Sequence, residues 1–201
     1  MKKKIYLLII ICLVSLFSAC KSSSDYDNKQ KRLYEDQINI NIEVKNYGTI
    51  SLELYPNLAP ITVDNFVSLV KSGFYDGLTF HRIIDGFMIQ GGSPQGNSSG
   101  GLSQKIKGEF EANGIKNELK HERGVISMAR AGNDYNSASC QFFIVHKTYP
   151  SLDGQYAAFG KVTNGIEVVD QIVKNTKIED SNGTVLKENQ PIIEKIYVVN
   201  G

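Results

Sequence analysis

The chain has 201 residues and a formal net charge of +1; 41% of its residues are hydrophobic and 21% are charged. This composition is that of an ordinary globular protein and excludes collagen-like, wholly disordered and multi-span membrane chains. The balanced charge gives no basic surface for nucleic acid, and 3 cysteines are too few for a disulfide scaffold.

The N-terminus has the pattern of a signal peptide. Three lysines precede an apolar run over residues 5–17, which is short for a membrane span of about 20 residues and typical of a signal-peptide core. Small residues then lead into Cys20, which resembles the lipobox cysteine of bacterial lipoproteins. Phe17 weakens the match, because leucine usually holds that position. The alternatives are an ordinary cleaved signal and a short uncleaved anchor.

We therefore expect three segments: a lipoprotein signal peptide at residues 1–19, a lipidated Cys20 with a flexible tether over 20–37, and one domain over 38–201. The tether is polar without apolar periodicity, and a flexible chain of its length reaches roughly 20–25 Å. The lipid would hold the domain at a membrane of the cell envelope, outside the cytoplasm. Cys140 would remain as the one free cysteine of the mature chain.

The domain has many short strand patterns and two helix patterns. Alternating apolar and polar residues predict a hairpin over 38–55. Pro60 suits the first turn of a helix over residues 60–72, and a second amphipathic pattern predicts a helix over 165–174. Further strands are predicted at residues 78–84, 87–91, 125–129, 141–145, 157–162 and 191–199. Many short strands with two helices favour a mostly β fold, a closed barrel capped by helices.

Common catalytic motifs are absent. The sequence has no Cys-x-x-Cys, and its three histidines lack metal-ligand spacing. The glycine-rich residues 96–101 lack the Lys-Ser/Thr of a phosphate loop. Cys140 adjoins an apolar strand, which favours a buried, inert thiol over a nucleophile. The triplet at 182–184 matches a glycosylation sequon, a match that is common by chance.

The segment Phe80-His81-Arg82-Ile83-Ile84-Asp85-Gly86-Phe87-Met88-Ile89-Gln90-Gly91-Gly92 combines one cation, one amide and large apolar groups. Taken alone, it is equally compatible with a barrel strand that carries a solvated arginine. It closely resembles the signature of the cyclophilin-type peptidyl-prolyl isomerases, however, and three further blocks resemble the same family in the same order. These blocks are residues 124–131, 139–144 and 152–162.

The resemblance covers roughly residues 38–200 and implies an eight-stranded antiparallel barrel closed by two helices. It also implies catalysis of cis/trans rotation about X-Pro bonds, a reaction that breaks no bond and needs no cofactor or metal. In the family an arginine donates to the prolyl nitrogen, which gains a basic lone pair as the amide twists, and the matching residue here is Arg82.

The remaining site residues are carried over from the family's motifs position by position. Gln90 matches the glutamine that orients the arginine. Ala129 and Arg130 match the segment whose backbone pairs with the peptide, and Gln141 lines the neighbouring pocket. The residues that match the apolar proline pocket are Phe87, Met88, Phe143, Leu152 and Tyr156.

Two departures from the family pattern matter. Ser151 stands where many members carry a tryptophan that contributes to cyclosporin binding, which predicts weak inhibition with activity retained. Arg130 replaces the asparagine of eukaryotic members, so we expect its role to lie mainly in its backbone.

The leading hypothesis is a membrane-tethered prolyl isomerase, a folding helper for exported proteins. It would act as a monomer on proline-containing polypeptides and bind the membrane only through its lipid. One alternative is a binding module or chaperone for proline-containing segments, with incidental turnover. A weaker alternative is a surface lipoprotein with an inactive isomerase fold.

Overall fold

A computed structural model describes residues 36–199 of the chain. The signal peptide, Cys20 and nearly all of the expected tether lie outside the described residues. The elements, in chain order, are β1 (Ile38–Val44), β2 (Gly48–Leu54), α2 (Pro60–Lys71), β3 (Phe80–Ile84), β4 (Met88–Gly91), η1 (Glu111–Asn113), β5 (Val125–Met128), β6 (Phe142–Val145), η2 (Pro150–Leu152), β7 (Ala158–Asn164), α3 (Ile166–Asn175), η3 (Lys187–Asn189) and β8 (Ile193–Val198).

The N-terminal hairpin follows directly from the sequence alternation. Residues 38–44 and 48–54 pair antiparallel, with Ile40 opposite Leu52 and Ile42 opposite Ile50. These four side chains are buried because side chains alternate between the two faces of a strand. Asn46 and Gly48 take positive φ angles of 66° and 122° at the turn, conformations that asparagine and glycine tolerate best.

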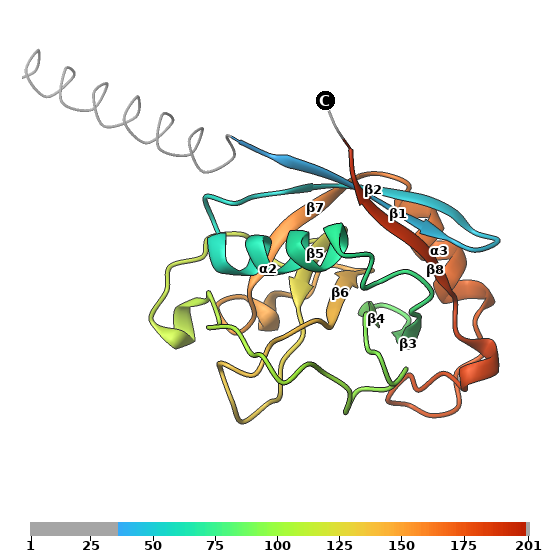
Figure 1. The fold of residues 1–201 in the computed structure, drawn as a ribbon. Coiled ribbons are helices and arrows are strands. Elements are labelled where there is room, and N and C mark those ends of the chain that lie inside the picture. Colours follow the sequence, from blue (N-terminus) through green and yellow to red (C-terminus); the bar gives the residue numbers. More distant parts are fainter. Residues whose placement is uncertain (1–35, 200–201) are drawn as a thin grey trace, which may run out of the picture. The chain divides into compact units, whose positions relative to one another are not determined.

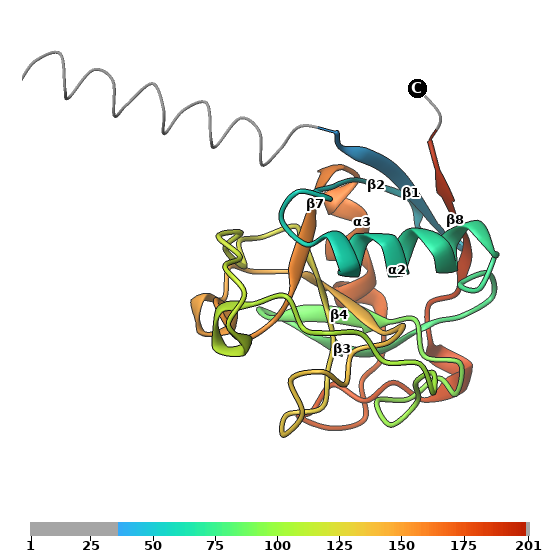
Figure 2. The ribbon, with the colours of Figure 1, turned by 60° about the vertical axis from the view of Figure 1, so that its left-hand side comes forward.

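All eight strands belong to one antiparallel sheet in the order β3-β4-β6-β5-β7-β2-β1-β8. The sheet curls into a half-barrel, and α2 and α3 lie on different sides of it (Figures 1 and 2). The expectation of a closed barrel is wrong. Within residues 36–199, β3 and β8 form no ladder; the segments leading into them are joined by an isolated bridge between Thr79 and Ile192 and by a hydrogen bond from the Gly77 amide to the Ile193 carbonyl at 2.8 Å.

The edge of β3 is occupied by a loop, which accounts for the missing ladder to β8. The Ile83 amide donates to the Gly183 carbonyl at 2.8 Å, and the Val185 amide donates to the His81 carbonyl at 3.1 Å. These bonds use the backbone groups with which β3 would otherwise pair with another strand. The loop thus takes the place of a closing strand.

A buried carboxylate fixes the first turn of α2. Pro60 begins the helix, and no side chain from the preceding residue caps it. Instead Glu109, which is 2% exposed, accepts from the Ile61 and Thr62 amides at 3.1 and 2.8 Å. Free amides and the positive end of the helix dipole both favour an anion there. The bond ties the long segment between β4 and β5 to the helix.

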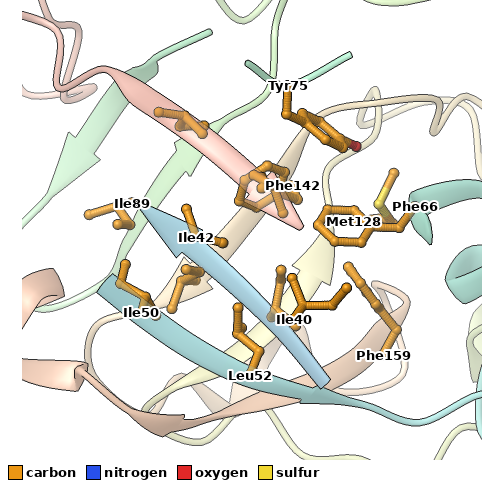
Figure 3. Packing of buried hydrophobic residues seen from close by; sticks show 14 of the residues in the cluster. Ile40, Ile42, Ile50, Leu52, Phe66, Tyr75, Ile89, Met128, Phe142 and Phe159 are labelled. Atoms are coloured by element: carbon orange, nitrogen blue, oxygen red, sulfur yellow. The ribbon is translucent and has the colours of Figure 1, made fainter. Parts of the chain in front are cut away.

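The main core fills the concave side of the curled sheet, where aromatic rings meet apolar side chains from β1 and β2 (Figure 3). Phe66 of α2 lies 5.2 Å from Tyr75, 5.5 Å from Phe142 and 5.2 Å from Phe159, measured between ring centroids. Tilted and edge-to-face pairs of this kind add to the gain from burial.

The predicted elements are confirmed, with ends that differ by a residue or two. The helices run over 60–71 and 166–175 against predictions of 60–72 and 165–174. Residues 92–123 contain one short 3-10 helix and no strand. In the described part of the chain, no helix combines the length and apolar character needed to cross a bilayer.

Candidate active site

A second, smaller apolar cluster is separate from the main core. Its members Met88, Phe143 and Leu152 line a cavity of about 120 Å³. Nine of the ten site residues predicted for the domain line this cavity: Arg82, Phe87, Met88, Gln90, Ala129, Arg130, Phe143, Leu152 and Tyr156. Residues from β3, β4, β6 and η2 and from the segments that follow β3, β5 and η2 therefore converge on one cavity.

Arg82 reaches the cavity because of strand alternation. Ile83 points into the core and is 1% exposed, whereas Arg82 is half-buried on the other face of β3. The register pairs Arg82 with Gln90 of β4, and the two strands lie side by side in Figure 2. One terminal nitrogen of Arg82 donates to Gln90 Oε1 at 3.3 Å, so the amide orients the guanidinium.

The surroundings of Arg82 combine apolar and polar groups. Its guanidinium carbon lies 5.9 Å from the Phe87 ring centroid, and a terminal nitrogen lies 3.9 Å from Met88 Sδ. Burial lowers the pKa of Arg82 from its usual value, an effect that Tyr156 and Asp180 oppose. A guanidinium keeps its proton at neutral pH, so a permanent cation faces a partly dry cavity.

Gln90 extends the network away from Arg82. Its amide nitrogen donates to Gln141 Oε1 at 2.8 Å, and Gln141 in turn donates to the Gly100 carbonyl. Gln141 does not line the first cavity. It lines a neighbouring cavity of about 400 Å³, which shares Gln90, Ala129 and Arg130 with the first. Gln141 thus lies beside the first cavity, in the wall of the adjoining one.

The apolar wall of the smaller cavity is rigidly supported. Phe143, Met88 and Leu152 are all less than 9% exposed. The Tyr156 ring meets Phe143 edge to face at 5.8 Å between centroids. This arrangement offers a small, preformed apolar slot beside the cation.

The side chain of Arg130 is more engaged than expected. Its guanidinium carbon lies 5.2, 4.8 and 4.6 Å from the ring centroids of Phe110, Tyr135 and Tyr156. It also donates to the backbone carbonyls of Gln155 at 3.0 Å and Ala131 at 2.9 Å. These contacts hold the Arg130 side chain at the rim of both cavities.

His121, which sequence reasoning did not select, lies behind the pocket wall. Its ring stacks on Phe143 at 6.0 Å between centroids. Nδ1 lies 3.1 Å from Asp153 Oδ1 and Nε2 lies 3.1 Å from Ser127 Oγ. The order Ser–His–Asp resembles a hydrolytic triad, but Ser127 is fully buried and meets no substrate. The bonds therefore support the pocket wall.

Two more contacts to the site come from residues that the sequence did not mark. The Tyr149 ring lies 4.5 Å from Phe87 between centroids, and Tyr149 is three positions before Leu152. The carbonyl oxygen of Asn182 accepts a hydrogen bond from Arg82 Nε at 2.8 Å. Asn182 had drawn notice only as part of a sequon triplet, and nothing local in the sequence links it to Arg82.

The remaining reactive groups lie elsewhere. Cys140 is fully buried, and burial raises the pKa of its thiol, so it has neither the access nor the charge of a nucleophile. Among residues 36–199, no group of three His, Cys, Asp or Glu side chains is placed to hold a metal ion. The site thus offers a fixed cation, two hydrogen-bonded glutamine side chains beside it and an apolar slot.

Comparisons with known proteins agree with this geometry. The family model for the cyclophilin type peptidyl-prolyl cis-trans isomerases matches residues 39–198. Peptidyl-prolyl cis-trans isomerase B of Bacillus subtilis is 50% identical over 139 residues, which are 69% of this chain and 87% of that protein. A peptidyl-prolyl cis-trans isomerase of Helicobacter pylori is 47% identical over 136 residues, covering 67% and 80% of the two chains.

The fold is likewise that of a solved relative. The crystal structure of a cyclophilin type peptidyl-prolyl cis-trans isomerase from Cryptosporidium parvum, obtained in the presence of the dipeptide Ala-Pro, superposes with a TM-score of 0.71 at 34% identity. The match covers 81% of this chain and 99% of that one. This chain therefore belongs to the cyclophilin-type peptidyl-prolyl cis-trans isomerases.

Proposed function

We propose that this peptidyl-prolyl cis-trans isomerase acts on exported polypeptides while a lipid on Cys20 holds it at a membrane, and that Arg82 is its main catalytic residue. The isomerase activity follows from the family and from relatives that are up to half identical. The observation that carries the role of Arg82 is its position, with the guanidinium fixed between Gln90 and the apolar slot.

The chemistry needs only positioning and one donor. Rotation about a peptide bond faces a barrier of about 18–20 kcal/mol, because the C–N bond has partial double-bond character. As the bond twists, the prolyl nitrogen loses conjugation and accepts a hydrogen bond that the planar states do not accept. A donor at that atom stabilises the transition state selectively. If the site lowers the barrier by about 7 kcal/mol, the rate rises about 10⁵-fold.

Each part of the site has a separate task in this mechanism. Arg82 donates to the prolyl nitrogen, and Gln90 holds Arg82 in the required orientation. Phe87, Met88, Phe143, Leu152 and Tyr156 grip the proline ring while the preceding carbonyl swings. The backbone at Ala129 and Arg130 aligns the peptide, and Gln141 lines the adjoining pocket for residues before proline.

The test of Arg82 is isomerisation of a short X-Pro peptide by the purified domain and by the Arg82→Ala variant. Loss of a single preorganised transition-state donor typically costs about 10²–10³-fold in kcat. We expect a loss of that order with binding of a proline peptide retained. Arg123→Ala removes an arginine that pairs with Asp170 outside the cavity, and it should leave turnover unchanged. Equal turnover by Arg82→Ala and the unaltered chain would remove Arg82 from the mechanism.

The same experiment separates the alternative of a binding module. A protein that only holds proline-containing segments has no use for a transition-state donor, so its peptide affinity would survive Arg82→Ala and its turnover would be negligible from the start. The placement of Arg82 in the cavity favours the enzyme, because binding alone is satisfied by the apolar slot.

The proposed tether rests on the sequence pattern before residue 36. Mass spectrometry of the mature N-terminus from cells tests it, with a diacylglycerol-modified Cys20 as the expected first residue. A Cys20→Ser variant should leave the membrane fraction while its peptide isomerisation stays unchanged. An unmodified cleaved terminus would refute the lipid anchor without touching the activity.

A further inference from the structure

The two ends of the Arg82 guanidinium have different partners. A terminal nitrogen faces Gln90 and the cavity, whereas Nε donates to the Asn182 carbonyl at 2.8 Å on the other side. A guanidinium presents its donors in a rigid planar fork. Fixing Nε therefore sets the direction in which the terminal nitrogens point.

The segment that supplies this carbonyl, residues 180–184, is held together by one carboxylate. Asp180 accepts from the Asn182 amide at 3.0 Å, from the Thr184 amide at 3.1 Å and from the Thr184 hydroxyl at 3.0 Å. The Gly183 amide also donates to the Asp180 carbonyl at 3.0 Å. These bonds fold the segment into a compact turn, so the direction of the Asn182 carbonyl is set within the segment.

The segment is also fastened to β3 on both sides of Arg82. The Gly183 carbonyl accepts from the Ile83 amide, and the Val185 amide donates to the His81 carbonyl. Figure 1 shows this part of the chain, in orange-red, beside β3. Gly183 has a φ of 78°, and a Cβ built on it would lie 2.3 Å from the Ile83 carbonyl oxygen. A glycine is thus required by both the backbone conformation and the close approach.

We propose that Asp180 and Gly183 are positioning residues for the isomerisation, which act by fixing the Asn182 carbonyl that aims Arg82 at the cavity. The inference rests on the proposed role of Arg82. It deepens that role, because it makes the orientation of the guanidinium depend on a segment 100 residues further along the chain. Gln90 alone leaves Nε unconstrained.

The first test is Gly183→Ala, compared with Gly114→Ala. Gly114 has a nearly equal φ of 75°, yet a Cβ there meets nothing within 4 Å, and it follows η1 away from Arg82. A misplacement of about 1 Å costs up to about 10²-fold in rate. We expect Gly183→Ala to lower kcat about 10- to 100-fold with KM for an X-Pro peptide nearly unchanged, and Gly114→Ala to leave both constants unchanged.

A second variant covers the case in which Gly183→Ala fails to fold. Asp180→Ala removes the exposed carboxylate without adding atoms, and it should lower kcat in the same sense by a smaller factor. Asp76→Ala is its control, because Asp76 is also exposed and accepts from one backbone amide, that of Ile196, far from the cavity.

The decisive comparison uses the Arg82→Ala background. A segment that acts only through Arg82 has no further effect on kcat once Arg82 is gone, so Asp180→Ala should cost nothing there. An equal loss in both backgrounds, or no difference between each variant and its control, would overturn the inference. Failure of the proposed function would be recognised separately, since the unaltered chain would then show no turnover or Arg82→Ala would show no loss.

Discussion

The guanidinium carbon of Arg130 lies 4.6 Å from the centroid of the Tyr156 ring, so a cation of the rim supports an aromatic wall of the pocket. Tyr156 in turn meets Phe143 edge to face. The same guanidinium donates to the Gln155 carbonyl, directly before Tyr156 in the chain. The side chains of Arg130 and Tyr156 therefore pack as one unit at the rim of the pocket.

Arg130→Lys should weaken peptide binding and leave the chemical step nearly intact. Lysine keeps the charge but lacks the planar fork that stacks on the rings and bonds to the Gln155 carbonyl. With about 1 kcal/mol lost at a half-exposed cation–π site, KM should rise about fivefold. Steady-state isomerisation of an X-Pro peptide measures this, with Arg123→Lys as the control. An unchanged KM would show that Arg130 acts through its backbone, as the family resemblance implied.

The sequence was most informative where the determinants are local. The hairpin over 38–54 follows from the alternation of apolar and polar residues, and both helices follow from helical spacing and Pro60. Arg82 reaches the cavity because successive side chains of a strand point to opposite faces. The family blocks then identified nine residues that line one cavity. In each case the information lies in short stretches of neighbouring residues.

The features that were missed depend on contacts between distant segments. The closed barrel was wrong because residues 183–185 occupy the edge of β3, and no periodicity in either segment encodes that pairing. The bond from Arg82 to Asn182 spans 100 positions, and the bond between the His121 ring and the Asp153 carboxylate spans 32. A polar side chain or a backbone carbonyl gives no sign in the sequence of which distant donor it will meet.

His121→Phe should destabilise the fold. Phenylalanine keeps the stack on Phe143 but removes both hydrogen bonds and leaves the buried Ser127 hydroxyl without its histidine partner. An unsatisfied buried polar group costs about 1–3 kcal/mol, so the free energy of unfolding should fall by about 2 kcal/mol. Urea denaturation measures the change.

The double variant His121→Phe with Ser127→Ala is the control for this interpretation. Once both partners are apolar, the unsatisfied hydroxyl no longer exists, and the combined loss should be smaller than the sum of the two single losses. Additive losses would mean that the hydrogen bond to Ser127 contributes little and that His121 supports Phe143 by packing alone.

Stability should fall in mild acid because of His81. This side chain is buried, and neither ring nitrogen has a hydrogen-bond partner among the described residues. Burial, followed by the charge of Arg82, lowers the pKa of His81 to about 4, and the neighbouring Gln141 side chain opposes this shift by a smaller amount. The unfolded chain binds this proton near pH 6.5, so between about pH 6.5 and about 4 the unfolded state holds more protons. The free energy of unfolding therefore falls as the pH drops through that window, by up to about 3 kcal/mol.

Urea midpoints at pH 7 and pH 4.5 for the unaltered chain and for His81→Leu test this origin. The variant should lose most of the pH dependence. Burial also lowers the pKa of His121, so a smaller slope of the same sign should remain. The exposed Asp134 and Asp180 have lowered pKa values and contribute only below this window. An identical slope in both proteins would assign the effect to other groups.

Cyclosporin should inhibit this isomerase weakly. Ser151 is exposed in η2, directly before the pocket residue Leu152, at the position where the family resemblance places a tryptophan that contacts the drug. A tryptophan there would add about 150–250 Å² of surface that can be buried against an apolar ligand, and serine offers almost none of it.

Ser151→Trp should lower the inhibition constant by about tenfold or more, since each 1.4 kcal/mol is a factor of ten. Turnover without the drug should stay unchanged, because Ser151 does not line the proline cavity. Titration of peptide isomerisation with cyclosporin measures both values, and nanomolar inhibition of the unaltered chain would contradict the argument.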